Sequence, residues 1–128
     1  MIATICCYFN WNNNETRKNN YKKFIENFKH PVEIVEIARK KKDFWIDGSL
    51  KILTNINNVL WQKERAFNIL IEQLPDKYNK ILWLDTDIIF QNKNFLGELE
   101  DKLDQHCMVQ PFESVYELNK GVKTRNQP

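Results

Sequence analysis

Apolar residues recur at strand-like and helix-like spacings along the first third of the chain. Residues 2–9 form an almost unbroken apolar run with β-branched and aromatic members, typical of a strand buried on both faces. Residues 15–29 follow three asparagines that favour a turn and a helix cap, and their apolar positions have helical spacing: Tyr21, Phe24, Ile25 and Phe28. Pro31 ends this helix, and the β-branched residues of 32–37 predict a second strand.

The remaining apolar residues predict a second helix, a strand and two shorter elements. From Leu60 one helical stripe runs to Pro75, through Leu60, Phe67, Leu70, Ile71 and Leu74. Residues 80–90 are the most apolar run in the chain and predict a central strand. Asn94 is suited to cap a short helix that carries Phe95, Leu99 and Leu103, and residues 106–112 resemble one more strand.

Strands and helices that alternate with short connections predict an α/β domain with a mostly parallel sheet. We expect one domain over residues 1–118, followed by a polar, frayed tail over 119–128 that holds Gly121, Lys123, Arg125 and Pro128. In such sheets ligands bind beyond the carboxyl ends of the strands.

Composition narrows the possible classes of protein. Hydrophobic residues make up 42% and charged residues 28%, as in ordinary globular domains, and a net charge of +2 without a dense basic stripe argues against nucleic-acid binding. The charged run at residues 39–43 favours a solvated loop over a phosphate-facing one. The start of the chain lacks a signal-peptide pattern, and no apolar stretch approaches the roughly 20 residues of a membrane span.

The cysteine pattern favours reduced thiols. Cys6 and Cys7 are adjacent, so on a strand they face opposite sides, and Cys107 leaves the number odd. No Cys-x-x-Cys or Cys/His spacing suits zinc. We expect Cys6 and Cys7 to be small buried hydrophobes in a cytoplasmic protein.

Asp85 and Asp87 are the strongest candidates for chemistry. Two residues apart on an extended chain, they project to the same side and can converge on one ion. The spacing alone is weak, but two unpaired carboxylates inside an apolar run would repel each other and lose hydration, and a cation would remove that cost. Hard oxygen donors without a nearby thiol or imidazole favour Mg2+ or Mn2+, which complete their shells with water and phosphate oxygens.

The blocks LWQKERAFN (residues 60–68), Leu74-Pro75 and ILWLDTDIIF (residues 81–90) resemble the nucleotide-sugar-binding half of GT-A glycosyltransferases, and residues 109–112 resemble the strand that follows. The resemblance covers 60–90 well and 2–118 loosely. It implies a Rossmann-like three-layer α/β/α fold and a DxD motif, Asp85-Thr86-Asp87, that binds Mn2+ or Mg2+. It also implies transfer of a hexosyl-type sugar from a UDP- or GDP-sugar donor to an unknown acceptor.

Lys63 and Glu64 form a second group of candidates. Glu64 falls on the apolar stripe of the second helix, where an apolar residue was expected and a charged one suggests a function. Lys63 and Glu64 both belong to the first turns of this helix, which should begin at the same sheet edge as Asp85 and Asp87. Lys63 would then contact the nucleotide or brace the aspartates. The alternative is a Lys63–Glu64 surface pair, and the family resemblance favours ligand contact.

Three further residues are candidates for contact with the nucleotide. Phe9 and Asn10, at the end of the first strand, occupy the place where the family holds the nucleoside, although an aromatic there is as often core. Glu36, near the end of the second strand, matches an acidic position that meets the base or ribose, with a solvent-facing carboxylate as the alternative. Glu113 is a weaker candidate for the acceptor side, and His30 and His106 receive no role.

The chain is shorter than the GT-A enzymes it resembles, which have later segments for the acceptor pocket and a further metal ligand. We therefore expect either a partner chain or second copy that supplies the acceptor half, or a truncated transferase that binds donor without turnover. A dehalogenase-type Mg2+ phosphotransferase is disfavoured, because Ile89 stands where that motif has threonine or valine. A non-catalytic nucleotide-binding or structural module stays open.

Overall fold

A computed structural model describes residues 1–57, 60–119 and 122–127, with the backbone alone for residue 119 and for 122–127. The chain divides into two compact units, residues 1–91 and residues 92–128. In the described residues no helix is long and apolar enough to cross a membrane.

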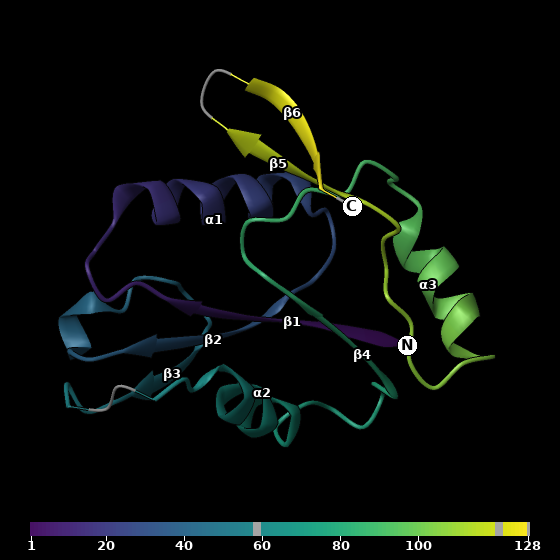
Figure 1. Cartoon of the computed structure of the whole chain (residues 1–128). Helices are drawn as coiled ribbons and strands as arrows, with labels where there is room; N and C mark the ends of the chain where they lie inside the picture. The colour runs from purple at the N-terminus through teal and green to yellow at the C-terminus, as the bar shows by residue number, and fades with distance from the viewer. Residues whose placement is uncertain (58–59, 120–121, 128) are drawn as a thin grey trace. The chain divides into compact units, whose positions relative to one another are not determined.

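The first unit is built on a sheet of four parallel strands (Figure 1). The strands lie in the order β3 (Leu50–Leu53), β2 (Glu33–Ala38), β1 (Ile2–Phe9) and β4 (Lys80–Leu84). Every pairing in this sheet is parallel. The prediction of an α/β unit with a mostly parallel sheet is confirmed, and the strand order is compatible with a Rossmann-like fold.

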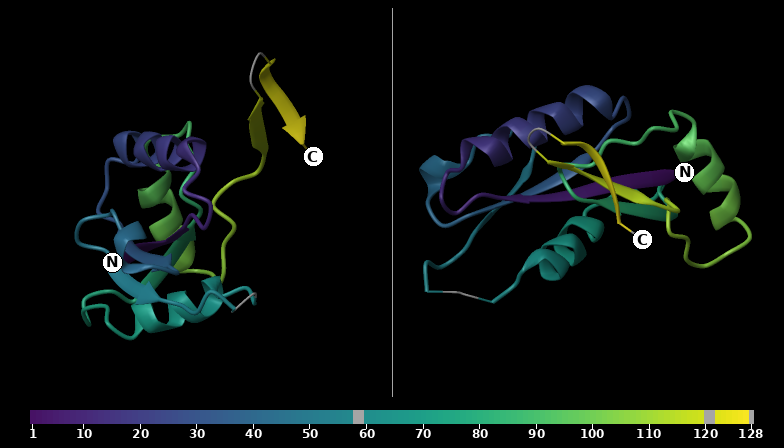
Figure 2. Two further views of the ribbon diagram at one scale, coloured as in Figure 1. Left: turned by 90° about the vertical axis from the view of Figure 1, so that its left-hand side faces the viewer. Right: turned by 45° about the horizontal axis from the view of Figure 1, so that its top comes forward.

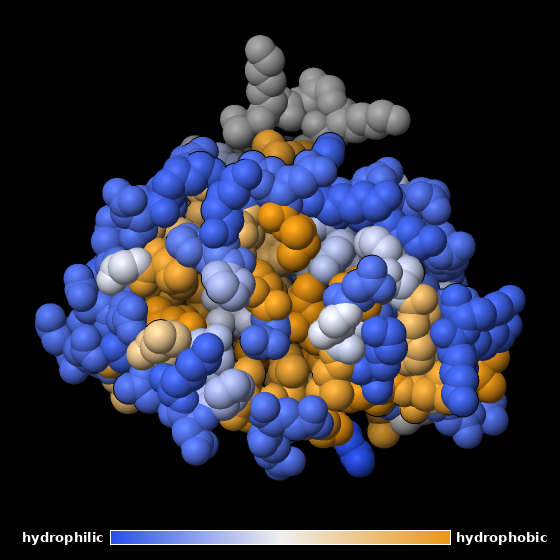
Figure 3. Space-filling view, turned by 180° about the vertical axis from the view of Figure 1, so that it is seen from behind, coloured by the Kyte–Doolittle hydropathy of each residue, from blue (hydrophilic) through white to orange (hydrophobic). Residues whose placement is uncertain are grey.

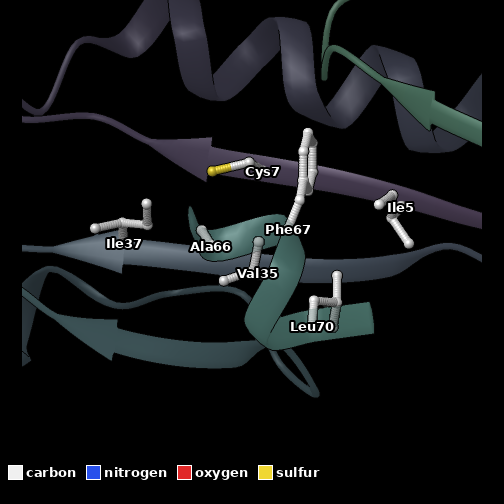
Figure 4. Packing of buried hydrophobic residues seen from close by; sticks show 7 residues of the cluster. All are labelled: Ile5, Cys7, Val35, Ile37, Ala66, Phe67 and Leu70. Atoms are coloured by element: carbon white, nitrogen blue, oxygen red, sulfur yellow. The ribbon is translucent and has the colours of Figure 1, made fainter. Parts of the chain in front are cut away.

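Helices α1 (Glu15–Asn27) and α2 (Lys63–Ile71) cover opposite faces of this sheet (Figures 1 and 2). On one face Ala66, Phe67 and Leu70 of α2 pack on the inward residues of β1 and β2, as Figure 4 shows. On the other face Tyr21 of α1 packs against Tyr8. The predicted strand 2–9 is confirmed with the same bounds, and its six inner residues are all buried.

The two adjacent cysteines face opposite sides of β1, as predicted. Cys7 belongs to the cluster under α2, whereas its neighbour Tyr8 belongs to the cluster under α1. Cys6 and Cys7 are both buried free thiols, and Cys107 is an exposed free thiol.

Strand β4 differs from its prediction in length and in place. The apolar run suggested a central strand over residues 80–90, but β4 ends at Leu84 and lies at the edge of the four-stranded sheet. Its burial alternates, and Trp83 is 68% exposed although its ring stacks on Phe67 at 6.2 Å between centroids. In the space-filling view of Figure 3, hydrophobic residues reach the surface between hydrophilic ones.

The segment between β2 and α2 contains two elements without a sequence prediction. The short helix η1 (Lys41–Asp43) lies in the charged run, and its residues are exposed, as expected for a solvated loop, whereas Arg39 is half-buried with its guanidinium 4.8 Å from the centroid of the Trp11 ring. Strand β3 follows and pairs with β2 from Val35↔Leu50 onward. It was missed because four alternating residues give too weak a signal.

Helix α2 starts later than its predicted stripe. It begins at Lys63, while Leu60 lies before it and is 78% exposed. Its buried residues are Ala66, Phe67 and Leu70, whereas Ile71 is exposed. The buried face is therefore narrower than predicted and excludes Glu64.

The second unit contains α3 (Phe95–Leu103) and a hairpin of β5 (Val115–Asn119) and β6 (Val122–Gln127). Helix α3 matches its prediction, but the Asn94 side chain makes no capping hydrogen bond. The strand predicted over 106–112 is wrong, since no strand is present there. Strands β5 and β6 pair antiparallel across the boundary predicted at 118/119. Gly121 and Pro128 lie outside the described residues.

Candidate functional site

A cavity of about 520 Å3 opens in the first unit at the carboxyl ends of β1 and β4. Four segments line it: the end of β1, the first turns of α1, the start of α2, and residues 85–87 after β4. The chain leaves β1 toward β2 on one side, while β4 lies on the other side of β1. Such a switch point is where open parallel sheets bind ligands.

The register of the strands explains the opening. Pairing between β1 and β4 ends at Cys6↔Leu84, whereas β1 continues to pair with β2 as far as Phe9↔Ile37. The two strands therefore part after Leu84. Cys7 and Phe9 of β1 line the space that results.

Asp85 and Asp87 both line this cavity, on the turn that follows β4. The expectation that they belong to an extended, apolar strand is wrong, because the strand has already ended and both residues are exposed. The side chain of Asp85 is 62% exposed. Desolvation of two buried carboxylates is therefore not the reason for a cation at this place.

Lys63 provides the closest charge to Asp85. It is the first residue of α2, and its Nζ donates a hydrogen bond and forms an ion pair with Asp85 Oδ1. The lysine side chain is only 20% exposed, and its Nζ lies 5.7 Å from the centroid of the Phe67 ring. The start of α2 and the end of β4 thus meet at one edge of the sheet, as the sequence predicted.

Glu64 points to a different neighbour. It is exposed, and its Oε1 accepts a hydrogen bond of 3.2 Å from Trp61 Nε1. Trp61 lines the cavity, so Glu64 acts on the site through this aromatic side chain.

Arg17 is a cavity residue that the sequence did not identify. Its Nη1 donates a hydrogen bond of 3.0 Å to the Phe9 carbonyl, and its guanidinium lies 5.2 Å from the centroid of the Phe9 ring. The only signal for it was its place in the first turn of a helix that follows β1. The cavity therefore has two cationic side chains, Arg17 from α1 and Lys63 from α2.

An aromatic wall consists of Phe9, Trp11 and Trp61. The Phe9 ring is half-buried and lies between the other two, 5.3 Å from Trp11 and 5.2 Å from Trp61 between centroids. Phe9 and Trp61 line the cavity itself. Phe9, a predicted nucleoside contact, is thus at a surface where a flat ring could stack.

Asn10 braces the loop between β1 and α1. Its amide nitrogen donates to Tyr8 Oη at 3.1 Å and to the Asn14 carbonyl at 2.9 Å, and its Oδ1 accepts from the Asn14 N–H at 2.8 Å. Both amide hydrogens are used inside the protein. Its side chain could therefore meet a nucleoside only through the remaining lone pair of Oδ1, and Asn10 is not among the residues that line this cavity.

Glu36 is buried at 1% exposure, so the solvent-facing alternative is wrong. Its two oxygens accept hydrogen bonds from Trp45 N at 2.8 Å, Ile46 N at 3.2 Å and Ser49 Oγ at 3.0 Å. Glu36 lies outside the lining of the cavity between β1 and β4. Its visible function is to hold the loop before β3.

The cysteine at the floor of the cavity is neutral. Burial raises the pKa of the Cys7 thiol to about 12, and the nearby Lys63 ammonium offsets only part of this effect. A thiol with such a pKa is a weak nucleophile and a poor metal ligand at neutral pH. Chemistry at this site therefore rests on oxygen and nitrogen groups.

The donor set fits a hard divalent ion that shares its shell with a ligand. In the described part of the chain, no group of three or more His, Cys, Asp or Glu side chains is arranged to hold a metal by itself. Asp85 and Asp87 provide carboxylate oxygens at one cavity. Mg2+ and Mn2+ suit such a pair, because these ions take one or two carboxylates and complete their shell with water and phosphate oxygens.

Glu113 is an exposed residue of the second unit, as is His106. His30 is exposed after α1, with its ring 5.5 Å from that of Phe28.

Comparison of the chain with models of protein families, with curated proteins and with solved structures gave no match.

Proposed function

We propose that the chain is the donor-binding part of a metal-dependent glycosyltransferase of the GT-A type, which takes a hexosyl-type sugar from a UDP- or GDP-sugar. One observation carries the proposal: Asp85 and Asp87 share a cavity at the switch point of a parallel sheet with Lys63 and Arg17.

The cavity contains both negative and positive side chains, so it favours a ligand that carries charges of both signs. Two carboxylates attract a cation, whereas two cationic side chains attract an anion. Helices α1 and α2 also begin at this cavity, and helix N-termini favour negative groups. A divalent ion bound to a diphosphate satisfies all of these groups at once.

Size and shape agree with a ligand of this class. A volume of about 520 Å3 falls within the range of roughly 300–1,000 Å3 that small-molecule sites occupy. The rings of Phe9 and Trp61 offer a stacking surface for a base or a sugar. The sequence blocks that resemble GT-A enzymes, residues 60–68 and 81–90, supply the start of α2 and the turn after β4, so the resemblance and the cavity involve the same residues.

Within this proposal Asp85 and Asp87 would hold Mn2+ or Mg2+, which as a Lewis acid stabilises the charge that forms on a departing nucleoside diphosphate. Lys63 and Arg17 would bind phosphate oxygens and orient the diphosphate. Acceptor recognition is assigned to groups outside this cavity, on a partner chain or a second copy.

Calorimetric titration of UDP and GDP, with and without Mn2+, tests the proposal. We expect binding that depends on Mn2+ and is reduced at least about 10-fold by Asp87→Ala, because one of two metal ligands is lost. Asp76→Ala removes the same charge from an exposed loop before β4 and should bind like the wild type.

Three outcomes separate the proposal from its alternatives. Nucleotide binding that is equally strong without metal would contradict the GT-A assignment. Hydrolysis of a generic phosphate ester that requires Asp85 would indicate the dehalogenase-type phosphotransferase. Metal-dependent binding without sugar transfer or donor hydrolysis would indicate a non-catalytic donor-binding module.

A further inference from the structure

The ion pair between Lys63 and Asp85 occupies a group that the proposed metal would need. Lys63 Nζ binds Asp85 Oδ1, and both side chains line the cavity beside Asp87. Asp85 keeps a second oxygen that could bind a metal ion, but an ion there would lie beside the Lys63 ammonium, and the two positive charges would repel each other. Metal binding to Asp85 therefore favours displacement of Lys63.

A displaced Lys63 would need a new partner. Its side chain is 20% exposed, and its ammonium lies 5.7 Å from the centroid of the Phe67 ring at the cavity. When displaced, the ammonium loses its ion pair, and a nearby metal ion adds repulsion. An anion in the same cavity would relieve both effects.

We propose that Lys63 couples the metal and the anion: it pairs with Asp85 and repels a cation while the cavity is empty, and it transfers to a phosphate oxygen when the metal and a diphosphate bind together. This inference rests on the proposed function, and it adds that neither ligand alone binds as well as the pair. Because coupling between two ligands is reciprocal, each must raise the affinity of the other by the same factor.

The coupling also gives the cavity selectivity. A free metal ion at Asp85 meets the positive charge of Lys63, and a free diphosphate that draws Lys63 away leaves the carboxylates of Asp85 and Asp87 unneutralised beside it. The complex of both ligands avoids each penalty. The site would thus discriminate against bare Mn2+ and against metal-free nucleotide.

Binding of Mn2+ alone, followed by the electron paramagnetic resonance signal of the free ion, is the first test. Lys63→Met removes the ammonium but keeps the length of the side chain, so Asp85 becomes available, and we expect Mn2+ to bind about 5-fold tighter than to the wild type. Lys29→Met is the matched control, since Lys29 is exposed beyond the far end of α1 and its loss changes the net charge equally. It should leave Mn2+ binding within about 2-fold of the wild type.

The second test repeats the titration with UDP present, with the free Mn2+ corrected for the Mn2+–UDP complex. In the wild type we expect UDP to tighten Mn2+ binding at least about 5-fold, whereas in Lys63→Met this factor should be about 3-fold smaller, because only the direct contact between metal and phosphate remains. Lys63→Arg keeps the positive charge and should retain most of the coupling. Circular dichroism and unfolding midpoints confirm that the variants are folded, which we expect because a partly exposed ion pair contributes little to stability.

The outcomes distinguish this inference from the proposed function. If Lys63→Met binds Mn2+ no better than the wild type, or if UDP tightens Mn2+ binding equally in both proteins, the coupling through Lys63 is refuted while the donor site stands. If Mn2+ and UDP fail to bind the wild type even together, or if UDP leaves Mn2+ binding to the wild type unchanged, the proposed function fails, and the coupling fails with it.

Discussion

At the scale of single residues, Glu36 is a buried carboxylate whose function is structural. It sits on β2 and gathers two backbone N–H groups and the Ser49 hydroxyl from the loop that leads to β3. The sequence singled out Glu36 as a candidate site residue but could not predict its structural role, because the hydrogen-bond donors come from residues 45–49, for which no element was predicted.

Replacement of Glu36 by Gln should destabilise the protein by about 1–3 kcal/mol, because an amide has one acceptor oxygen and would turn its own hydrogens toward buried donors. Chemical denaturation measures this change. Glu26→Gln, on the exposed face of α1, is the control and should stay within about 0.5 kcal/mol of the wild type. Equal stability of the two variants would mean that the loop does not depend on Glu36.

The buried thiols of β1 should make the free energy of unfolding fall at alkaline pH. Burial raises the pKa of both Cys6 and Cys7 from 9.0 to about 12, so the folded state favours the protonated form. This contribution is complete below about pH 9 and is lost as the pH rises toward 12. Under reducing conditions the free energy of unfolding should fall by up to about 1.4 kcal/mol per pH unit for each thiol between these limits.

Denaturant unfolding at several pH values, compared with a Cys6→Ala/Cys7→Ala variant, checks this expectation. The variant should have a shallower slope, with a remainder from Tyr21, whose pKa burial also raises to about 12. Parallel slopes in both proteins would contradict the burial of the two thiols.

At the scale of elements, the start of α1 is fixed by Asn14. Its side chain accepts a hydrogen bond from Arg17 N at 3.2 Å, and Asn10 holds the preceding loop. Asn14→Ala should lower stability by about 1 kcal/mol, whereas Asn14→Asp should retain most of it, because aspartate caps a helix in the same way. Thermal unfolding separates these variants, and equal losses in both would show that capping is not what Asn14 contributes.

Elements with a strong hydrophobic pattern in their own sequence were predicted well, whereas elements whose bounds depend on neighbouring strands were not. Strand β1 is buried on both faces, so its apolar run marks its bounds. Strand β4 was predicted too long because Ile88 to Phe90 are also apolar, while the strand ends where its pairing with β1 ends. The prediction of a strand over 106–112 was wrong for the same reason: an apolar run does not reveal whether a partner strand is present.

The candidate site follows the same rule. Topology predicted that the start of α2 and the end of β4 would meet, and Lys63 does contact Asp85. Arg17 was missed because a polar residue on a helix gives no sign of facing a cavity. The Asp85–Asp87 pair was predicted as partly buried, but its exposure depends on where β4 leaves the sheet.

At the scale of the whole molecule, the four-stranded sheet, the clusters of buried residues under α1 and α2, and the cavity belong to residues 1–91. We expect a fragment of these residues to fold and to bind Mn2+ with UDP within about 3-fold of the full chain, because it keeps this sheet and every residue that lines the cavity. Circular dichroism and calorimetry test it. An unfolded fragment would show that residues 92–128 are needed for the core.

The central claim is that the cavity between β1 and β4 holds a metal ion together with a nucleoside diphosphate. Paramagnetic broadening of amide resonances in a 15N-labelled chain, with UDP and a small fraction of Mn2+ present, locates the ion directly. The claim predicts the strongest broadening at Cys7, Lys63 and residues 85–87, and its loss in Asp87→Ala. Broadening centred on other carboxylates, such as those of α3, or unchanged by Asp87→Ala, would contradict it.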